Sequence, residues 1–394
     1  MCNKFDYIIV GGGIVGAATA YKLQLKFKDK SIAILEKESE LAMHQTGRNS
    51  GVIHSGIYYT PNSYKARNCK NGRDQLVNFV KEHQIKHDIC GKVIVATTKE
   101  EVIVLDAIFQ KGIENGTPGI RFLNSEEIKE KEPFIEGVKA IWVPSAGIVD
   151  FVGVTKKFAE LITELQPKSN VFTNCKVLDL YGSKLETTLG TFTAEKIIVC
   201  GGLFADRLAT KGGANLDLQI VGFRGDYYKL TEQAKHKVKN LIYPTPDPKF
   251  PFLGVHFTPM VNSDIECGPN AVFSFKREGY KNTSFLLKDT FQALTYKGTL
   301  KLFSKHWRKG LEEYRRAFSK RLFVKELQRM MPSITMNDVT YARAGVRAQA
   351  LNSKGDLVDD FKIITLGNQI HVLNAPSPAA TSCMAIADEI VNQI

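Results

Sequence analysis

The chain has 394 residues with a formal net charge of +12, and 43% of its residues are hydrophobic and 24% charged. This composition excludes a disordered chain and predicts a globular protein with two lobes, while the positive charge favours anionic partners. The seven cysteines include no Cys-x-x-Cys pair, which argues against a disulfide framework and against a zinc site. We therefore expect a reducing compartment and no bound metal.

An apolar, glycine-rich stretch occupies residues 7–21. It is too short to cross a bilayer, and no basic segment precedes it as in a secretory signal. We therefore expect a cytoplasmic protein that does not span a membrane.

The same region has the pattern of a nucleotide-binding βαβ unit. Residues 5–10 (FDYIIV) predict a buried parallel strand, and Gly11, Gly13 and Gly16 follow in G-x-G-x-x-G spacing before a helix. The second strand, within SIAILEK at 31–37, ends at Glu36, where a carboxylate can accept hydrogen bonds from the adenosine ribose. The pattern predicts a dinucleotide site, with a plain βαβ packing unit as the alternative.

This glycine fingerprint occurs in full once. Residues 196–209 (KIIVCGGLFADRLA) form a similar strand–glycine–helix turn without the full spacing. An enzyme that carries both a flavin and a nicotinamide needs two such sites, so the chain holds either NAD or FAD.

The stretch GRNSGVIHSGIYYTP at residues 47–61 decides between the two. Its small residues alternate with donors, among them Arg48, Asn49, Ser50 and His54. A glycine-rich surface loop or an anion-binding nest are the alternatives, but close backbone approach to a flavin accounts best for so many donors. We therefore predict FAD.

Several segments resemble the D-amino-acid oxidase superfamily and, within it, the L-2-hydroxyglutarate oxidase/dehydrogenase family: HQTGRNSGVIHSGIYYTPNSYKA, VPSAGIVDF, FRGDYYKL, GPNAVFSFKREGY, AGVRAQ and NAPSPAATSCMAIADEI. The resemblance covers essentially the whole chain. It implies FAD-dependent oxidation of L-2-hydroxyglutarate to 2-oxoglutarate, with electrons passed to a quinone or oxygen. An amine or amino-acid oxidase of the same superfamily is the alternative. Two positions depart from the family pattern: Gly222 stands where proline is expected, and Pro259 where arginine is usual.

The fold class expected from these features is α/β, with a Rossmann-type FAD-binding lobe and a mainly antiparallel-sheet substrate lobe. We assign residues 1–82, 145–211 and 340–394 to the FAD-binding domain. Residues 83–144 and 212–339 form the expected substrate domain.

The C-terminal segment completes the expected cofactor site. A strand at 369–373 precedes a loop fixed by Pro376 and Pro378, and a closing helix should begin near residues 379–381. Its positive end would stabilise a reduced flavin. The alternative is a C-terminal helix capped by Thr381 without a ligand. The expected cofactor-binding residues are Gly11, Gly13, Ile14, Val15, Gly16, Glu36, Lys37, Thr46, Gly47, Arg48, Asn49, Ser50, Gly51, Val177, Gly201, Gly202, Arg347, Pro378, Ala379, Ala380 and Thr381.

Oxidation of a small dicarboxylate requires an anchor for its carboxylate and a base for the hydroxyl proton. Arg347 in AGVRAQ is the expected anchor, because a guanidinium binds a carboxylate with two parallel hydrogen bonds. His54 and His256 are the alternative bases, whereas His371 is expected to pack in the last strand. The candidates for the second carboxylate stay open: Tyr58, Tyr59, Arg224, Tyr227 and Lys276.

A strongly basic segment extends over residues 288–329, with twelve lysines and arginines against four acids. Apolar residues recur there at helical spacing: Leu300, Phe303, Trp307, Leu311, Tyr314, Phe318 and Leu322. The pattern predicts two amphipathic helices packed on the substrate lobe. The alternative is a patch that docks on anionic lipid beside a membrane quinone, on the inner face of the plasma membrane. We expect no nucleic-acid binding, because no nucleic-acid motif accompanies the charge.

Overall fold

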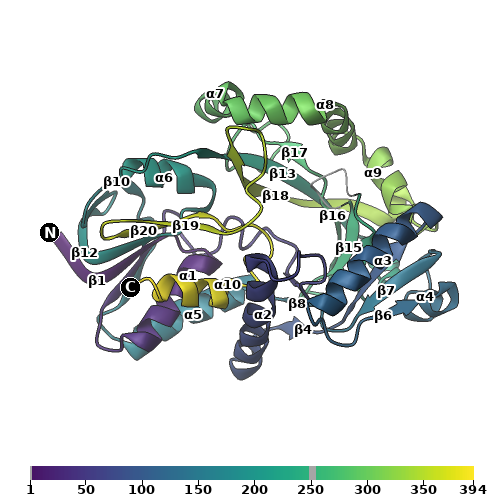
Figure 1. Cartoon of the computed structure of the whole chain (residues 1–394), viewed down its shortest axis with the longest axis horizontal. Coiled ribbons are helices and arrows are strands. Elements are labelled where there is room, and N and C mark those ends of the chain that lie inside the picture. Colours follow the sequence, from purple (N-terminus) through teal and green to yellow (C-terminus); the bar gives the residue numbers. More distant parts are fainter. Residues whose placement is uncertain (1, 248–253) are drawn as a thin grey trace.

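The computed structural model describes residues 2–247 and 254–394. Two large β-sheets occupy opposite ends of the molecule, and helices cover their outer faces (Figure 1). The predicted α/β fold class is confirmed.

The first sheet has a parallel centre. β1 pairs in parallel with β2 on one side and with β12 on the other, and β9 and β20 extend the parallel set. β10, β11 and β19 add antiparallel strands at its edges. The strands are β1 (Cys2–Val10), β2 (Ile32–Leu35), β9 (Asn170–Phe172), β10 (Val177–Tyr181), β11 (Lys184–Thr187), β12 (Gly190–Val199), β19 (Lys362–Leu366) and β20 (Gln369–Asn374).

Three helices pack side by side against this sheet: α1 (Ile14–Lys26), α5 (Phe151–Leu165) and α10 (Cys383–Val391) (Figure 1). Their apolar faces and the central strands share one core, which includes Ile9, Leu23, Ile34, Ile162 and Ile386. α6 (Ala205–Lys211), after the short turn η1 (Gly202–Phe204), packs against β10, β12 and β20. Because both faces are covered, β2 is apolar and buried along its whole length, and β1 and β12 end in buried apolar runs at Tyr7–Val10 and Ile197–Val199.

The second sheet is mainly antiparallel, as predicted for the substrate lobe. β13 and β18 are its longest strands and pair along their whole length. Its other strands follow the order β17–β13–β16–β15–β14–β5–β7–β6, in which β14 and β5 are parallel. The strands are β5 (Lys92–Ala96), β6 (Arg121–Leu123), β7 (Lys139–Val143), β13 (Leu218–Leu230), β14 (Leu241–Pro244), β15 (His256–Pro259), β16 (Ile265–Gly268), β17 (Val272–Phe273) and β18 (Val339–Asn352).

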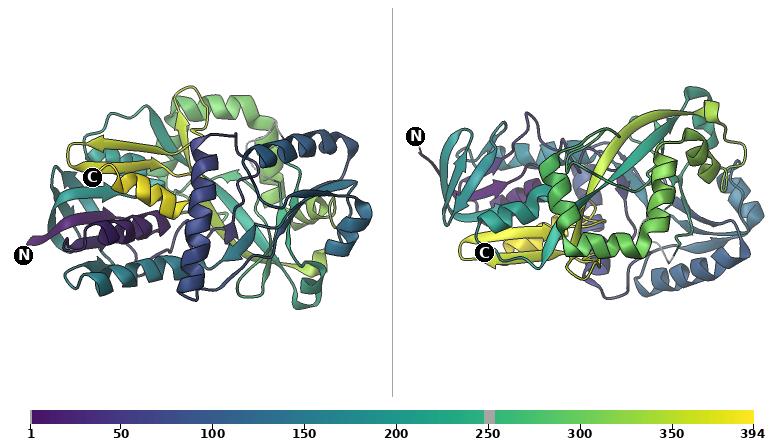
Figure 2. Two further views of the ribbon diagram at one scale, coloured as in Figure 1. Left: turned by 60° about the horizontal axis from the view of Figure 1, so that its bottom comes forward. Right: turned by 90° about the horizontal axis from the view of Figure 1, so that it is seen from above.

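A small antiparallel sheet lies at the junction of the two ends, formed by β3 (Val52–Ile53), β8 (Gly147–Val149) and β4 (His87–Asp88). The long helix α2 (Tyr64–Glu82) crosses this junction and packs on α10 (Figure 2, left). Gly72 permits this approach, because a Cβ there would lie 2.6 Å from the Cα of Ser382. α3 (Lys99–Glu114) and α4 (Ser125–Lys131) cover the strands β5 to β7.

The basic segment forms three helices rather than the predicted two: α7 (Leu287–Thr295), α8 (Lys297–Ala317) and α9 (Lys320–Leu327). They describe an arc along the outside of the second sheet (Figure 2, right). Phe303 and Tyr314 pack against the sheet as predicted, but Trp307 is 59% exposed and Phe318 69% exposed. Leu300, Leu311 and Leu322 are also exposed, so most of the predicted apolar stripe does not face the sheet; non-helical backbone at His306 interrupts α8.

Except for Val339, β18 lies within the segment 340–394 that the sequence analysis places in the FAD-binding domain. It pairs with β13, which belongs to the second sheet. We therefore propose that the last boundary between the domains lies near Asn352. None of the helices in residues 2–247 and 254–394 is both long enough and apolar enough to cross a membrane.

Candidate active site

A cavity of about 1010 Å³ extends between the two ends of the molecule. Its walls come from the β1–α1 turn, the segment after β2, the loop before α10 and the strands β13, β15 and β18. Pockets at the junction of two lobes are common cofactor and substrate sites, and this volume is at the upper end of their range.

The glycine turn forms one end of the cavity. Gly11 has a φ of +109°, and a Cβ on Gly16 would lie 2.1 Å from the carbonyl oxygen of Gly11, so this tight strand–helix packing requires glycine. At Gly13 the space is open, because a Cβ there would meet Thr46 Oγ1 at 3.4 Å as its one near neighbour. α1 begins at Ile14, whose N–H donates to Thr46 Oγ1 at 3.0 Å, and the N-terminus of the helix lies at this wall, where its positive end favours a pyrophosphate.

Glu36 directly follows β2 and lines the cavity, as predicted. Its Oε2 accepts a hydrogen bond from the Gly12 N–H at 2.7 Å, and its Oε1 accepts one from the Glu38 N–H at 2.9 Å. Each carboxylate oxygen can accept more than one hydrogen bond, so this fixed carboxylate retains capacity for ribose hydroxyls.

Arg48, Asn49 and Ser50 of the GRNSG segment line the cavity, and the side chains of Arg48 and Asn49 also hold neighbouring backbone. The Arg48 guanidinium carbon lies 3.8 Å from the ring centroid of Tyr280, and Arg48 Nη1 donates to the Ala344 carbonyl. The Asn49 amide donates to the Thr46 carbonyl at 2.8 Å and accepts from the Gly51 N–H at 2.7 Å. Their side chains therefore shape the cavity wall, a role that the sequence pattern alone does not distinguish from cofactor contact.

The C-terminal loop forms another part of the wall, with Pro378, Ala379 and Ala380 lining the cavity. α10 begins at Cys383, later than predicted, because residues 379–382 form turns. Thr381 does not line the cavity. Its hydroxyl accepts from the His54 N–H at 3.1 Å and donates to the Val52 carbonyl at 3.2 Å, so it joins the loop to β3.

The remaining predicted residues include some that line the cavity and some that do not. The structure places four of them outside its lining: Gly47, Gly51, Arg224 and Lys276. A Cβ on Gly47 would lie 2.5 Å from the Ala42 carbonyl oxygen, and Gly51 has a φ of +67°, so both glycines serve the turn. Arg224 is buried against Asp226 and the Lys281 carbonyl. In addition to the lining residues described in the preceding paragraphs, the following predicted residues line the cavity: Ile14, Val15, Lys37, Thr46, Ser50, Val177, Gly201, Gly202, Arg347, His54, His256, Tyr58, Tyr59 and Tyr227.

The two histidines lie in the cavity wall in their neutral form. Burial and the charge of Lys92 lower the pKa of His54 to about 3, and the same two causes, with Arg347, lower the pKa of His256 to about 3. His256 Nδ1 lies 2.9 Å from the Gly254 carbonyl oxygen, which can only accept, so Nδ1 carries the proton and Nε2 is left as an acceptor. His371 is buried in β20 and bonds to Gln369, as predicted for a packing residue.

Arg347 lies on β18 opposite Phe223 of β13 and lines the cavity. Its Nη1 lies 3.4 Å from the Asn270 carbonyl oxygen. The neighbouring Arg343 has a different role, because it binds Glu266 and the carbonyl oxygens of Gly47 and Asn49. The sequence pattern identified the first arginine and missed the second.

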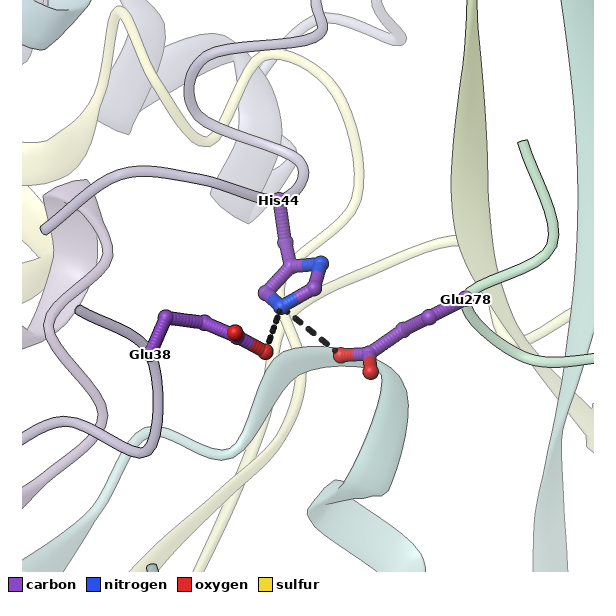
Figure 3. Close-up of side chains that lie close together, drawn as sticks. All are labelled: Glu38, His44 and Glu278. Carbon is purple, nitrogen blue, oxygen red and sulfur yellow. Dashed lines mark hydrogen bonds and ion pairs between the residues drawn. The ribbon is translucent and has the colours of Figure 1, made fainter. Parts of the chain in front are cut away.

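A polar cluster lies beside the cavity, near Glu36. Glu38 and Glu278 approach His44 Nε2 at 2.8 and 3.1 Å from two sides of the imidazole ring (Figure 3). Lys37 Nζ lies 2.9 Å from the same nitrogen and 2.8 Å from Glu278 Oε1, so an ammonium group already supplies the positive charge that the carboxylates need. The cluster is an ion-pair network between the two lobes, and no local pattern in the sequence predicts it.

The observed wall fits a flavin dinucleotide. The open face at Gly13, the fixed carboxylate of Glu36 and the long cavity that ends at Arg347 and the two histidines provide a place for phosphates, ribose and a large ring system.

Comparisons with known proteins agree with this geometry. Residues 6–393 match the family DAO, described as FAD dependent oxidoreductase. An L-2-hydroxyglutarate dehydrogenase from Indibacter alkaliphilus is 46% identical over 98% of both chains. The human mitochondrial L-2-hydroxyglutarate dehydrogenase is 43% identical, covering the whole of this chain and 89% of its own length. Among solved structures, an FAD-bound L-alpha-glycerophosphate oxidase from Mycoplasma pneumoniae shares the fold with a TM-score of 0.79, at 24% identity over 99% of this chain and 94% of its own. The chain therefore belongs to the FAD-dependent oxidoreductase family and, within it, to the L-2-hydroxyglutarate dehydrogenases.

Proposed function

We propose that the protein oxidises L-2-hydroxyglutarate to 2-oxoglutarate. The observation that carries the proposal is the presence of one guanidinium, Arg347, and two neutral imidazoles, His54 and His256, in the wall of one cavity that also contains the phosphate-binding turn. The similarity to L-2-hydroxyglutarate dehydrogenases supports this substrate.

In the proposed reaction the substrate loses its C2 hydrogen together with an electron pair. It also loses the proton of its hydroxyl group. FAD, when bound, supplies the two-electron acceptor. Arg347 holds the carboxylate beside C2 and so fixes the orientation of the reacting carbon. His54 or His256 takes the hydroxyl proton, for which Nε2 of His256 is available. The turn at Gly11, Gly13 and Gly16, together with Glu36, would hold the phosphates and the ribose.

An anaerobic titration of the purified FAD-loaded protein tests this function. L-2-Hydroxyglutarate should bleach the oxidised flavin absorbance, and stoichiometric 2-oxoglutarate should appear. L-Glutamate and sarcosine, the substrates expected of an amine or amino-acid oxidase, should leave the spectrum unchanged. If either amine bleaches the flavin and L-2-hydroxyglutarate does not, the alternative function is correct.

We further propose that α7, α8 and α9 dock the protein on an anionic membrane surface, where a quinone can receive the electrons. The exposed apolar side chains of this segment include Leu287, Phe291, Trp307 and Leu322 on the helices and Phe318 between α8 and α9. The segment 288–329 also carries the local excess of positive charge. Exposed apolar and cationic side chains together favour anionic lipid, which attracts the cations while the apolar groups insert.

Sedimentation with vesicles tests the docking proposal. The protein should pellet with vesicles that contain anionic lipid, remain in the supernatant with neutral vesicles, and be released by high salt. A Trp307→Glu/Phe318→Glu double variant should bind more weakly while it keeps its rate of flavin reduction. Equal pelleting of the variant and the parent protein would contradict the proposal.

A further inference from the structure

Lys92 is a buried lysine that the reaction described above does not use. It begins β5 between Val143 of β7 and Leu241 of β14, and its side chain is 1% exposed. Its Nζ lies 4.2 Å from the ring centroid of Tyr243 and 5.5 Å from that of Tyr58. Among the described residues, no carboxylate forms an ion pair with this ammonium group. A buried charge without a counter-ion is strongly unfavourable, which makes this position unusual for a purely structural side chain.

The Tyr58 hydroxyl provides a second, independent observation. Tyr58 lines the cavity, and its hydroxyl oxygen is buried without a hydrogen-bond partner among the described residues. An unpaired buried hydroxyl group is destabilising by roughly 1–3 kcal/mol. A ligand that accepts a hydrogen bond would satisfy it.

The acids in the cavity wall are engaged elsewhere. Glu36 accepts two backbone N–H groups, Glu278 pairs with Lys37 and His44, and Asp359 pairs with Lys65. Near Tyr58 and Tyr243, Arg347 is a cation in the cavity wall and Lys92 is a cation behind it. This local positive charge suits a ligand with more than one negative group.

Building on the proposed function, in which the substrate is a five-carbon diacid, we propose that Lys92 and Tyr58 recognise its second carboxylate. The Tyr58 hydroxyl donates a hydrogen bond to that carboxylate, and the Lys92 ammonium group behind the two tyrosine rings supplies the balancing charge. Arg347 holds the other carboxylate. Because charges interact strongly in a weakly polar interior, Lys92 can favour a dianion without direct contact.

The experiment compares L-2-hydroxyglutarate with its 5-amide, in which the second carboxylate is neutral. Lys92→Met removes the charge from a side chain of similar length, and Tyr58→Phe removes one hydroxyl group. For each variant we expect kcat/KM for the diacid to fall at least about tenfold and kcat/KM for the amide to change less than about threefold. The preference for the diacid over the amide should therefore decrease.

Lys237→Met is the matched control, because Lys237 pairs with Asp338 in the same lobe and does not line the cavity. It should leave the ratio of the two kcat/KM values unchanged. The inference is wrong if either test variant lowers kcat/KM for both substrates in parallel, or changes neither. If Lys92→Met does not fold, Tyr58→Phe decides the question alone. Failure of the parent protein to oxidise L-2-hydroxyglutarate would instead overturn the proposed function.

Discussion

The backbone N–H of His54 donates a hydrogen bond to the hydroxyl oxygen of Thr381 at 3.1 Å, across most of the length of the chain. The same hydroxyl group donates to the Val52 carbonyl at 3.2 Å, and the Thr381 side chain is fully buried. One hydroxyl therefore fixes both the strand that leads into His54 and the loop before α10. The candidate base and the C-terminal wall of the cavity are positioned by the same contact.

We expect Thr381→Val to destabilise the protein by about 1–3 kcal/mol, because valine fills the same space but leaves the His54 N–H and the Val52 carbonyl without partners. Thermal unfolding in the presence of saturating FAD measures this change. Thr365→Val is the control, since the exposed Thr365 bonds to Gln393 at the surface. Equal melting temperatures for the two variants would show that the buried contact has no special role.

Substitution of each histidine distinguishes the two candidate bases. Loss of the base should slow anaerobic flavin reduction by about 10²- to 10⁴-fold, because the hydroxyl proton then has no acceptor in the transition state. Loss of the other histidine should change mainly KM. Stopped-flow absorbance of His54→Gln and His256→Gln gives both rates. If both variants reduce flavin within tenfold of the parent rate, the proton goes to another group.

We expect the free energy of unfolding to decrease as the pH falls below 6.5, because buried histidines resist protonation in the folded protein. Burial lowers the pKa of His54 and His256 to about 3 and that of His371 to about 4, from the usual 6.5. Below pH 6.5 the unfolded chain binds protons that the folded chain excludes, so stability is complete above pH 6.5 and falls as the pH approaches the folded-state values. Each histidine should contribute a loss of about 1.4 kcal/mol per pH unit.

Urea unfolding at pH 7.0 and pH 5.5, with FAD in excess, measures this dependence. His371→Gln should reduce the difference between the two pH values by the contribution of one histidine, and it lies outside the cavity. A pH dependence that is identical in this variant and the parent protein would contradict the assignment.

The sequence predicts best the parts of the site that depend on local geometry. The spacing of Gly11, Gly13 and Gly16 specifies a turn, and the turn forms where predicted. Lys92 could not be recognised, because it begins an ordinary apolar strand, KVIVA, and its neighbours Tyr58 and Tyr243 come from distant segments. The resemblance to a known family identified Arg347, which the structure places in the cavity wall. Contacts between distant segments therefore account for what the sequence missed.

Arg347→Lys should lower kcat/KM for L-2-hydroxyglutarate by about 100-fold while the FAD content is retained. Lysine keeps the charge but loses the planar pair of donors that orients a carboxylate, so the reacting carbon is misplaced. Steady-state kinetics and the flavin absorbance of the purified variant measure the two quantities. If kcat/KM falls less than threefold, charge alone is sufficient and the bidentate anchor is wrong.

Arg343 supports the GRNSG segment from β18. It binds Glu266 with Nε and Nη2 at 2.7 and 3.0 Å, and it donates to the carbonyl oxygens of Gly47 and Asn49 at 2.6 and 2.8 Å. Arg343→Met removes these contacts and leaves the buried Glu266 without its cation. We expect a loss of roughly 3 kcal/mol in the free energy of unfolding and faster FAD release.

Arg329→Met is the matched control for this loss, because the half-exposed Arg329 pairs with Glu101 and Glu326 at the surface, where such pairs contribute about 1 kcal/mol or less. Arg343→Met/Glu266→Gln should recover part of the stability, since the unpaired charge is removed, but FAD should still leave faster because Gly47 and Asn49 remain unsupported. Full recovery of FAD retention in the double variant would show that Arg343 serves only to neutralise Glu266.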